Sequence, residues 1–76
     1  MISRPRIVRA QPSGAPTRAE WAIPVIVTIH WQQGGEEQVN AVATAWTSEA
    51  VEVVWSTPGG ETSVDWVPAA DVRRVK

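Results

Sequence analysis

The chain has 76 residues, no cysteine, five tryptophans and a formal net charge of −1. This length allows a single domain, and the lack of cysteine excludes disulfides, thiolate metal ligands and a cysteine nucleophile. Every acidic residue lies between Ala19 and Val72, and every lysine and arginine lies outside that stretch. An acidic centre with basic ends favours either contact between the two or recognition of a charged partner.

Residues 1–19 are predicted to form a flexible, basic, proline-rich tail, because Pro5, Pro12 and Pro16 interrupt helical structure and few groups are available for a core. The segment lacks the apolar stretch of a signal peptide, and the longest apolar run, 22–29, is too short to cross a bilayer. We therefore expect a cytoplasmic protein without a membrane partner, with its folded domain over residues 20–76.

The folded part is predicted to begin with two strands. Alternation predicts the first over residues 23–31, and the adjacent glycines of 32–35 predict a turn. Its inward face comprises Val25, Val27, Ile29 and Trp31. A second strand is expected over 37–46, where the apolar residues change parity, and a bulge or bend near 43–45 would reconcile them.

A third strand is predicted over 50–56 and a fourth over 61–67, joined by a turn over 57–60. If the hairpin closes on Pro58–Gly60, the cross-strand pairs form one apolar face. The expected pairs are Trp55 with Thr62, Val53 with Val64, and Val51 with Trp66. In that register Glu52 and Asp65 point outward.

Pro68 is expected to end the fourth strand, followed by a 3₁₀ turn over 69–71 and a short last strand over 72–75. Five short antiparallel strands with this turn predict an all-β, SH3-like barrel, an architecture whose closure removes exposed sheet edges. Arg73 and Arg74 would then adjoin the acidic body as neighbours of groups such as Asp71.

Residues 51–75 resemble the second half of Tudor-like domains, with Trp66–Val67–Pro68 closing a strand and Asp71–Val72–Arg73 following it. The resemblance implies an SH3-like barrel of the Tudor-like type. In that family an aromatic cage captures methylated lysine or arginine by cation–π attraction. Carried over to this chain, the cage residues would be Trp31, Trp46 and Trp55, with Asn40 as a polar partner.

Residues 63–70 are also similar to the closing stretch of type II, plasmid-borne dihydrofolate reductases, which are short SH3-like chains that act as tetramers. A Val-Gln-Ile-Tyr run lines the shared pore in that family, whereas residues 64–67 here are Val-Asp-Trp-Val. The likeness supports the fold, and the residues for the activity are missing. An oligomeric, pore-forming enzyme is therefore one of the functional hypotheses that the sequence leaves open.

The side chains predict neither catalysis nor a metal or cofactor site. His30 is the single histidine and lacks the nucleophile and orienting acid of a general base, so it is interpreted as a surface or half-buried strand residue. One histidine and scattered acids do not form a zinc ligand set. Glu36 and Glu37 are adjacent at a hairpin tip and point apart, and the paired glycines do not precede a helix, as a phosphate loop requires.

The tryptophans divide into groups. Trp55 and Trp66 lie on the valine-rich face and are expected in the core, and Trp21 is expected to staple the tail to the barrel. Trp31 and Trp46 end their strands next to turns. Each could either cover one end of the core or be exposed as a contact for a partner.

We expect a non-catalytic binding module for a basic protein or peptide, because acids and tryptophans suit such a partner. The predicted contact residues are Trp31, Trp46, Trp55, Asn40, Glu36, Glu37 and Glu49. One alternative is nucleic-acid binding through the basic ends. Its residues would be Arg4, Arg6, Arg9, Arg18, Arg73, Arg74 and Lys76. Another alternative is a structural or assembly protein of a phage or mobile element.

Overall fold

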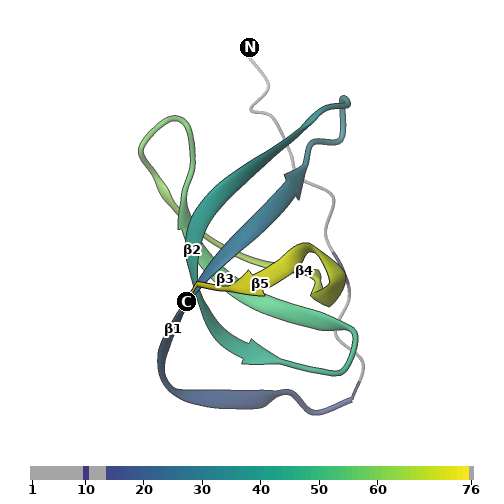
Figure 1. Ribbon diagram of the computed structural model, residues 1–76, viewed down its shortest axis with the longest axis vertical. Helices are drawn as coiled ribbons and strands as arrows, with labels where there is room; N and C mark the ends of the chain where they lie inside the picture. The colour runs from purple at the N-terminus through teal and green to yellow at the C-terminus, as the bar shows by residue number, and fades with distance from the viewer. Residues whose placement is uncertain (1–9, 11–13, 76) are drawn as a thin grey trace.

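The computed structural model describes Ala10 and residues 14–75, which form a single antiparallel sheet of five strands (Figure 1). The strands are joined in the spatial order β4-β3-β2-β1-β5. The elements are β1 (Thr17–His30), β2 (Glu36–Trp46), β3 (Ala50–Ser56), β4 (Thr62–Pro68), the 3₁₀ turn η1 (Ala69–Asp71) and β5 (Val72–Arg74). The predicted all-β, five-stranded fold with a 3₁₀ turn before its last strand is confirmed. The described residues include no helix long and apolar enough to cross a bilayer.

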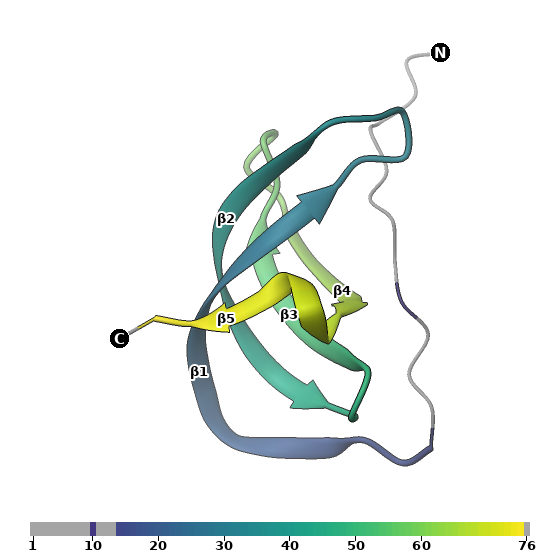
Figure 2. The ribbon, with the colours of Figure 1, turned by 45° about the vertical axis from the view of Figure 1, so that its right-hand side comes forward.

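The long strand β1 starts at Thr17, earlier than the sequence predicted, and pairs with β2 on one side and β5 on the other. Its pairing with β2 is interrupted between Arg18 and Ile23, where β1 turns through a sharp corner (Figure 2). Residues 17–19, predicted to be part of the tail, therefore belong to the sheet. The rest of that predicted tail, apart from Ala10 and residues 14–16, lies outside the described residues.

The predicted bulge in β2 is confirmed. Ala43 pairs with Val53 and Ala45 with Glu52, so Thr44 is the extra residue. Its hydroxyl donates to Oε1 of Glu52 at 2.8 Å, which gives the inserted residue a polar partner. A bulge of this kind bends the strand and increases its twist, and the sheet curls around its own core at this point.

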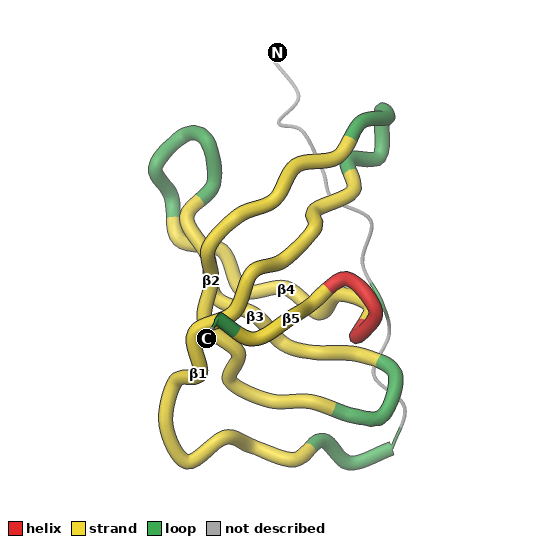
Figure 3. The backbone as a smooth tube through the Cα atoms, in the orientation of Figure 1, coloured by secondary structure: helices red, strands yellow, loops and turns green. Residues whose placement is uncertain are grey.

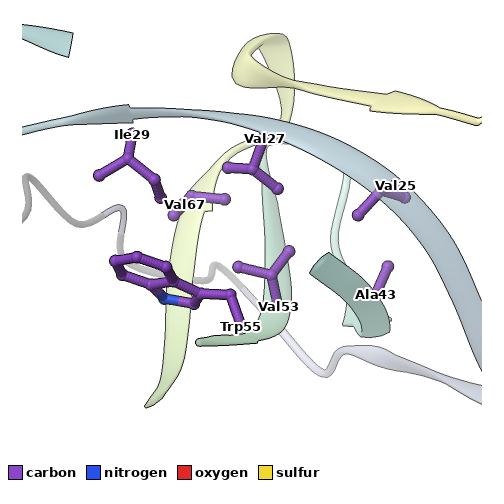
Figure 4. Close-up of a cluster of buried hydrophobic side chains, with 7 residues drawn as sticks. All are labelled: Val25, Val27, Ile29, Ala43, Val53, Trp55 and Val67. Carbon is purple, nitrogen blue, oxygen red and sulfur yellow. The ribbon is translucent and has the colours of Figure 1, made fainter. Parts of the chain in front are cut away.

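The core lies on the concave side of the sheet. Figure 4 shows its side chains converging from four strands. They are Val25, Val27, Ile29, Ala43, Val53, Trp55 and Val67. The predicted inward face of β1 is confirmed, since its two valines and Ile29 are buried and Trp31 packs against the same cluster. Each buried branched aliphatic side chain contributes roughly 1.5–3 kcal/mol.

The predicted register of the β3–β4 hairpin is wrong by one residue. Trp55 pairs with Ser63, Val53 with Asp65, and Val51 with Val67. The cause is the loop: Thr57 N–H donates to the Glu61 carbonyl at 2.8 Å, so five residues, 57–61, separate the strands. A shift of one residue moves every side chain of a strand to its other face.

The register correction reverses the two faces of β4. Val67, at 2% exposure, enters the core, while Val64 is 58% exposed. Trp66, expected in the core, instead pairs with Glu52 and is half-buried on the opposite face. Asp65, expected outside, is 4% exposed and faces the interior with Val53. A carboxylate is tolerated there because it accepts hydrogen bonds.

Candidate functional site

Most of the predicted contact residues lie at two opposite ends of the sheet. Glu36 pairs with His30, the last residue of β1, whereas Trp46 pairs with Thr17, the first. The turn that carries Trp31 therefore lies far from the β2–β3 loop that carries Glu49, as the tube in Figure 3 shows. One binding site of ordinary size includes only one of these groups.

Trp31 and Trp55 form the centre of the first group. Their ring centroids are 6.1 Å apart and their planes are tilted by 59°. Trp55 is 4% exposed, which confirms its expected place in the core and leaves little of it accessible to a partner. Trp31 is half-buried, so it provides the accessible surface of the pair. Tilted aromatic pairs of this kind are favourable beyond the area that they bury.

A buried carboxylate fixes the Trp55 ring. The indole Nε1–H of Trp55 donates to Oδ2 of Asp65 at 2.9 Å, and the hydroxyl of Ser63 donates to the same oxygen at 2.6 Å. All three residues point to the interior from β3 and β4. This group was not predictable from the sequence, because the predicted register placed Asp65 outside. Hydrogen bonds to a charged acceptor are strong, so the Trp55 ring, against which Trp31 packs, is held rigidly.

The single histidine lies between two acids at the same end. His30 Nδ1 is 3.4 Å from Oε2 of Glu36, and its Nε2 is 3.3 Å from Oδ2 of Asp71. These acids come from β2 and from η1, so the imidazole links the β1–β2 hairpin to the 3₁₀ turn. Among the described residues, no group of His, Cys, Asp or Glu side chains has the arrangement of a metal site.

The end that carries Trp31 is acidic. Glu36 and Glu37 are exposed at the start of β2, and Glu37 pairs with Ile29, which places it on the same face as Trp31. The β3–β4 turn, with Glu61, lies at this end as well (Figures 1 and 3). Within residues 14–75, the arginines belong to the other end of β1 or to β5.

The remaining predicted contacts lie elsewhere. Trp46 is half-buried and pairs with Val51 at the far end of β2. Glu49 is exposed in the β2–β3 loop, where its backbone carbonyl accepts a hydrogen bond from Ala69. Asn40 is exposed on the outer face of β2, opposite Ile26, and does not join the tryptophan pair.

The described arginines are partly engaged by residues of the sheet itself. Arg18 Nη1 donates to Oε1 of Glu52 at 2.8 Å, and Arg73 Nη2 donates to Oε1 of Gln38 at 3.3 Å. Arg73 and Arg74 lie in β5 as expected, but within residues 14–75 the carboxylate of Asp71 pairs with His30 and not with them. Arg4, Arg6, Arg9 and Lys76 lie outside the described residues.

The exposure of Trp21 was not predicted. This residue is 71% exposed at the corner of β1, where pairing with β2 is interrupted. We expected a staple between tail and barrel, and a ring so exposed does not pack in that way. Periodicity does not signal the corner, because it depends on how many residues of β1 are left unpaired.

Comparison of the chain with protein-family models, with curated proteins and with solved structures found no match. The resemblances to Tudor-like domains and to type II dihydrofolate reductases therefore remain predictions from the sequence.

Proposed function

We propose that the protein is a non-catalytic binding module whose β1–β2 end recognises a basic segment of a protein or peptide. The proposal is carried by one observation. The accessible ring of Trp31 packs against Trp55, whose own ring is held by Asp65. Exposed Glu37 shares the face of Trp31, and exposed Glu36 lies at the same end on the opposite face, next to His30. We name this arrangement, with Glu61 of the neighbouring turn, the acidic tryptophan end.

Each part of the acidic tryptophan end suits a cationic side chain. An indole face attracts lysine or arginine through its quadrupole, by about 0.5–1 kcal/mol at exposed sites and more where water is excluded. Exposed carboxylates around it raise the association rate and disfavour acidic partners. The Trp31 ring rests on a buried, hydrogen-bonded neighbour, so little side-chain freedom is lost on binding.

The proposal predicts where a basic ligand binds. In an NMR titration with a short peptide rich in lysine and arginine, the indole N–H of Trp31 and the amides of Glu36 and Glu37 should shift. Those of Trp46 and Glu49 should stay in place. A peptide of the same length with glutamine at the basic positions is the control ligand. Shifts at the Trp46 end, or none at low salt, would contradict the proposal.

Two glutamate variants test the charge contribution with matched chemistry. Glu37→Gln removes one charge at the acidic tryptophan end, and Glu49→Gln removes one at the opposite end. We expect Glu37→Gln to weaken binding by about 2- to 5-fold, which corresponds to an exposed ion pair of up to ~1 kcal/mol. Glu49→Gln should bind like the unchanged protein. Equal losses in both variants would indicate attraction by overall charge and not a site.

Trp31→Ala tests the aromatic contribution. We expect it to weaken binding by about tenfold or more, since aromatic anchors dominate interfaces of this kind. Circular dichroism and the indole signal of Trp55 show whether the variant retains its fold. A folded Trp31→Ala variant that binds the peptide with unchanged affinity would refute a role for the ring.

A further inference from the structure

The two edges of the sheet differ in their protection against pairing with another strand. β5 forms one edge, has three residues and carries two arginines. β4 forms the other edge and has seven residues. Natural sheets protect their edges by short strands, charged side chains or covering segments. By these criteria the β5 edge is protected. The protection of the β4 edge depends on its side chains and on the segments that cover it.

The outward face of β4 is uncharged. It consists of Thr62, Val64 and Trp66, and Val64 is 58% exposed. The single charged residue of the strand, Asp65, is turned inward, where Trp55 and Ser63 donate to it. An exposed valine in the middle of an edge strand whose outward side chains are uncharged is a typical site for the addition of another strand.

One backbone contact shows that the β4 edge accepts a hydrogen bond from a segment outside the sheet. The N–H of Ala10 donates to the carbonyl of Trp66 at 3.0 Å, and Ala10 is half-buried. The polar backbone groups of Trp66 therefore point away from β3. In an antiparallel ladder these groups alternate in direction, so those of Thr62 and Val64 point away from β3 as well. Among the described residues, Ala10 thus occupies the Trp66 carbonyl, one of these outward-pointing backbone groups.

We propose that the β4 edge pairs antiparallel with β4 of a second copy of this chain, centred on Val64, and that the contact of Ala10 competes with this pairing. A two-fold axis at Val64 places the two valines opposite each other and each Thr62 opposite a Trp66. β-branched and aromatic residues form favourable cross-strand pairs. The axis makes the interface isologous, as in most homodimers.

A second copy suits this edge better than a charged partner does. The outward side chains along the β4 edge are uncharged, so they offer no ion pair to a basic or acidic segment. The formal net charge of the chain is −1, which opposes self-association only weakly. The inference is independent of the acidic tryptophan end, since it uses neither Trp31 nor the glutamates.

The mass of the protein in solution tests the pairing, measured by light scattering and analytical ultracentrifugation over a range of concentrations. Ala10→Pro removes the competing N–H and keeps the length of the chain. We expect it to lower the dimer dissociation constant by about 2- to 10-fold, the equivalent of one hydrogen bond. Ala10→Ser keeps the N–H and should behave like the unchanged protein. If both the unchanged protein and Ala10→Pro are monomers throughout, the proposal is overturned.

Two valine variants distinguish the β4 edge from the rest of the surface. Val64→Lys places a charge on the β4 edge and should abolish the dimer. Val75→Lys makes the same change beyond β5, where Val75 is 48% exposed, and should leave the dimer intact. Equal loss in both variants, or no loss with Val64→Lys, would refute pairing through β4.

Hydrogen exchange of the unchanged protein gives a second readout that needs no variant. In the proposed dimer, the N–H of Val64 donates to the carbonyl of the other Val64. Its exchange should therefore slow as the protein concentration rises, whereas the amide of Val75 should not respond. Concentration-independent exchange at Val64 in a sample that is dimeric by mass would show that another surface forms the dimer.

Discussion

The indole N–H of Trp55 donates to the carboxylate of Asp65 across the β3–β4 hairpin, at 2.9 Å. The two residues are each 4% exposed, and the hydroxyl of Ser63 donates to the same oxygen. This contact joins the core to the candidate site, because Trp31 packs against the ring that it orients. The register of one hairpin thus determines both what is buried and what supports the exposed tryptophan.

Trp55→Phe should destabilise the fold by about 2–4 kcal/mol, because it removes a donor to a buried carboxylate and leaves unfilled volume. Chemical denaturation followed by circular dichroism measures the change. Trp21→Phe is the matched control, since Trp21 is 71% exposed, and it should stay within about 0.5 kcal/mol of the unchanged protein. Similar losses in the two variants would mean that the hydrogen bond to Asp65 is not part of the folded state.

The register of β4 predicts opposite results for two alanine substitutions three residues apart. Val67→Ala should cost about 1–3 kcal/mol of unfolding free energy, because Val67 is buried in the core. Val64→Ala should change it by less than about 0.5 kcal/mol, because Val64 is 58% exposed. Thermal or urea unfolding gives both values. A larger loss of unfolding free energy for Val64→Ala than for Val67→Ala would contradict the observed register and support the one predicted from the sequence.

The β3–β4 loop contains a matched pair of glycines. Gly60 has a φ of +83°, whereas Gly59 is outside the positive-φ range and an added Cβ there meets only ordinary contact, at 3.9 Å. Gly60→Ala should therefore destabilise the protein by roughly 1–2 kcal/mol, through the left-handed backbone that alanine disfavours. Gly59→Ala should be neutral or stabilising by up to ~1 kcal/mol. Comparable unfolding midpoints for the two variants would contradict this loop geometry.

The ion pair of Arg18 with Glu52 ties the start of β1 to β3, at 2.8 Å between Nη1 and Oε1. A double-mutant cycle with Arg18→Ala and Glu52→Ala should give a coupling energy of about 0.2–1 kcal/mol, since the arginine is largely exposed. Glu52→Ala alone should cost more than Arg18→Ala, because Thr44 also donates to Glu52. Zero coupling in denaturation measurements at low salt would place Arg18 outside the folded body.

Several parts of the fold followed from local patterns. Alternating valines and isoleucine predicted the buried face of β1, and the change of parity in β2 predicted the bulge at Thr44. The bounds of β3, Ala50–Ser56, were predicted correctly from the turn residues on either side. These features are encoded within a few neighbouring residues, so they could be inferred without knowing the sheet.

The candidate site was only partly predictable for a related reason. The sequence predicted contacts at Trp31, Glu36 and Glu37, which flank one turn and therefore lie at the same end of the sheet. It also grouped Trp46 and Glu49 with them, and these lie at the other end of β1 and β2. Which residues share an end depends on strand pairing, which no single segment encodes.

The sequence by itself determined that this chain is an all-β domain with a 3₁₀ turn before its last strand, an acidic centre and basic ends. Tertiary structure alone decided the register of β4, because the hydrogen bonds of the 57–61 loop and the burial of Asp65 select between two pairings of equal local quality. It alone turned Val64 outward at a sheet edge and placed Asp65 beneath the tryptophan pair. Alternation gives a strand two faces, and only its neighbours determine which face is buried.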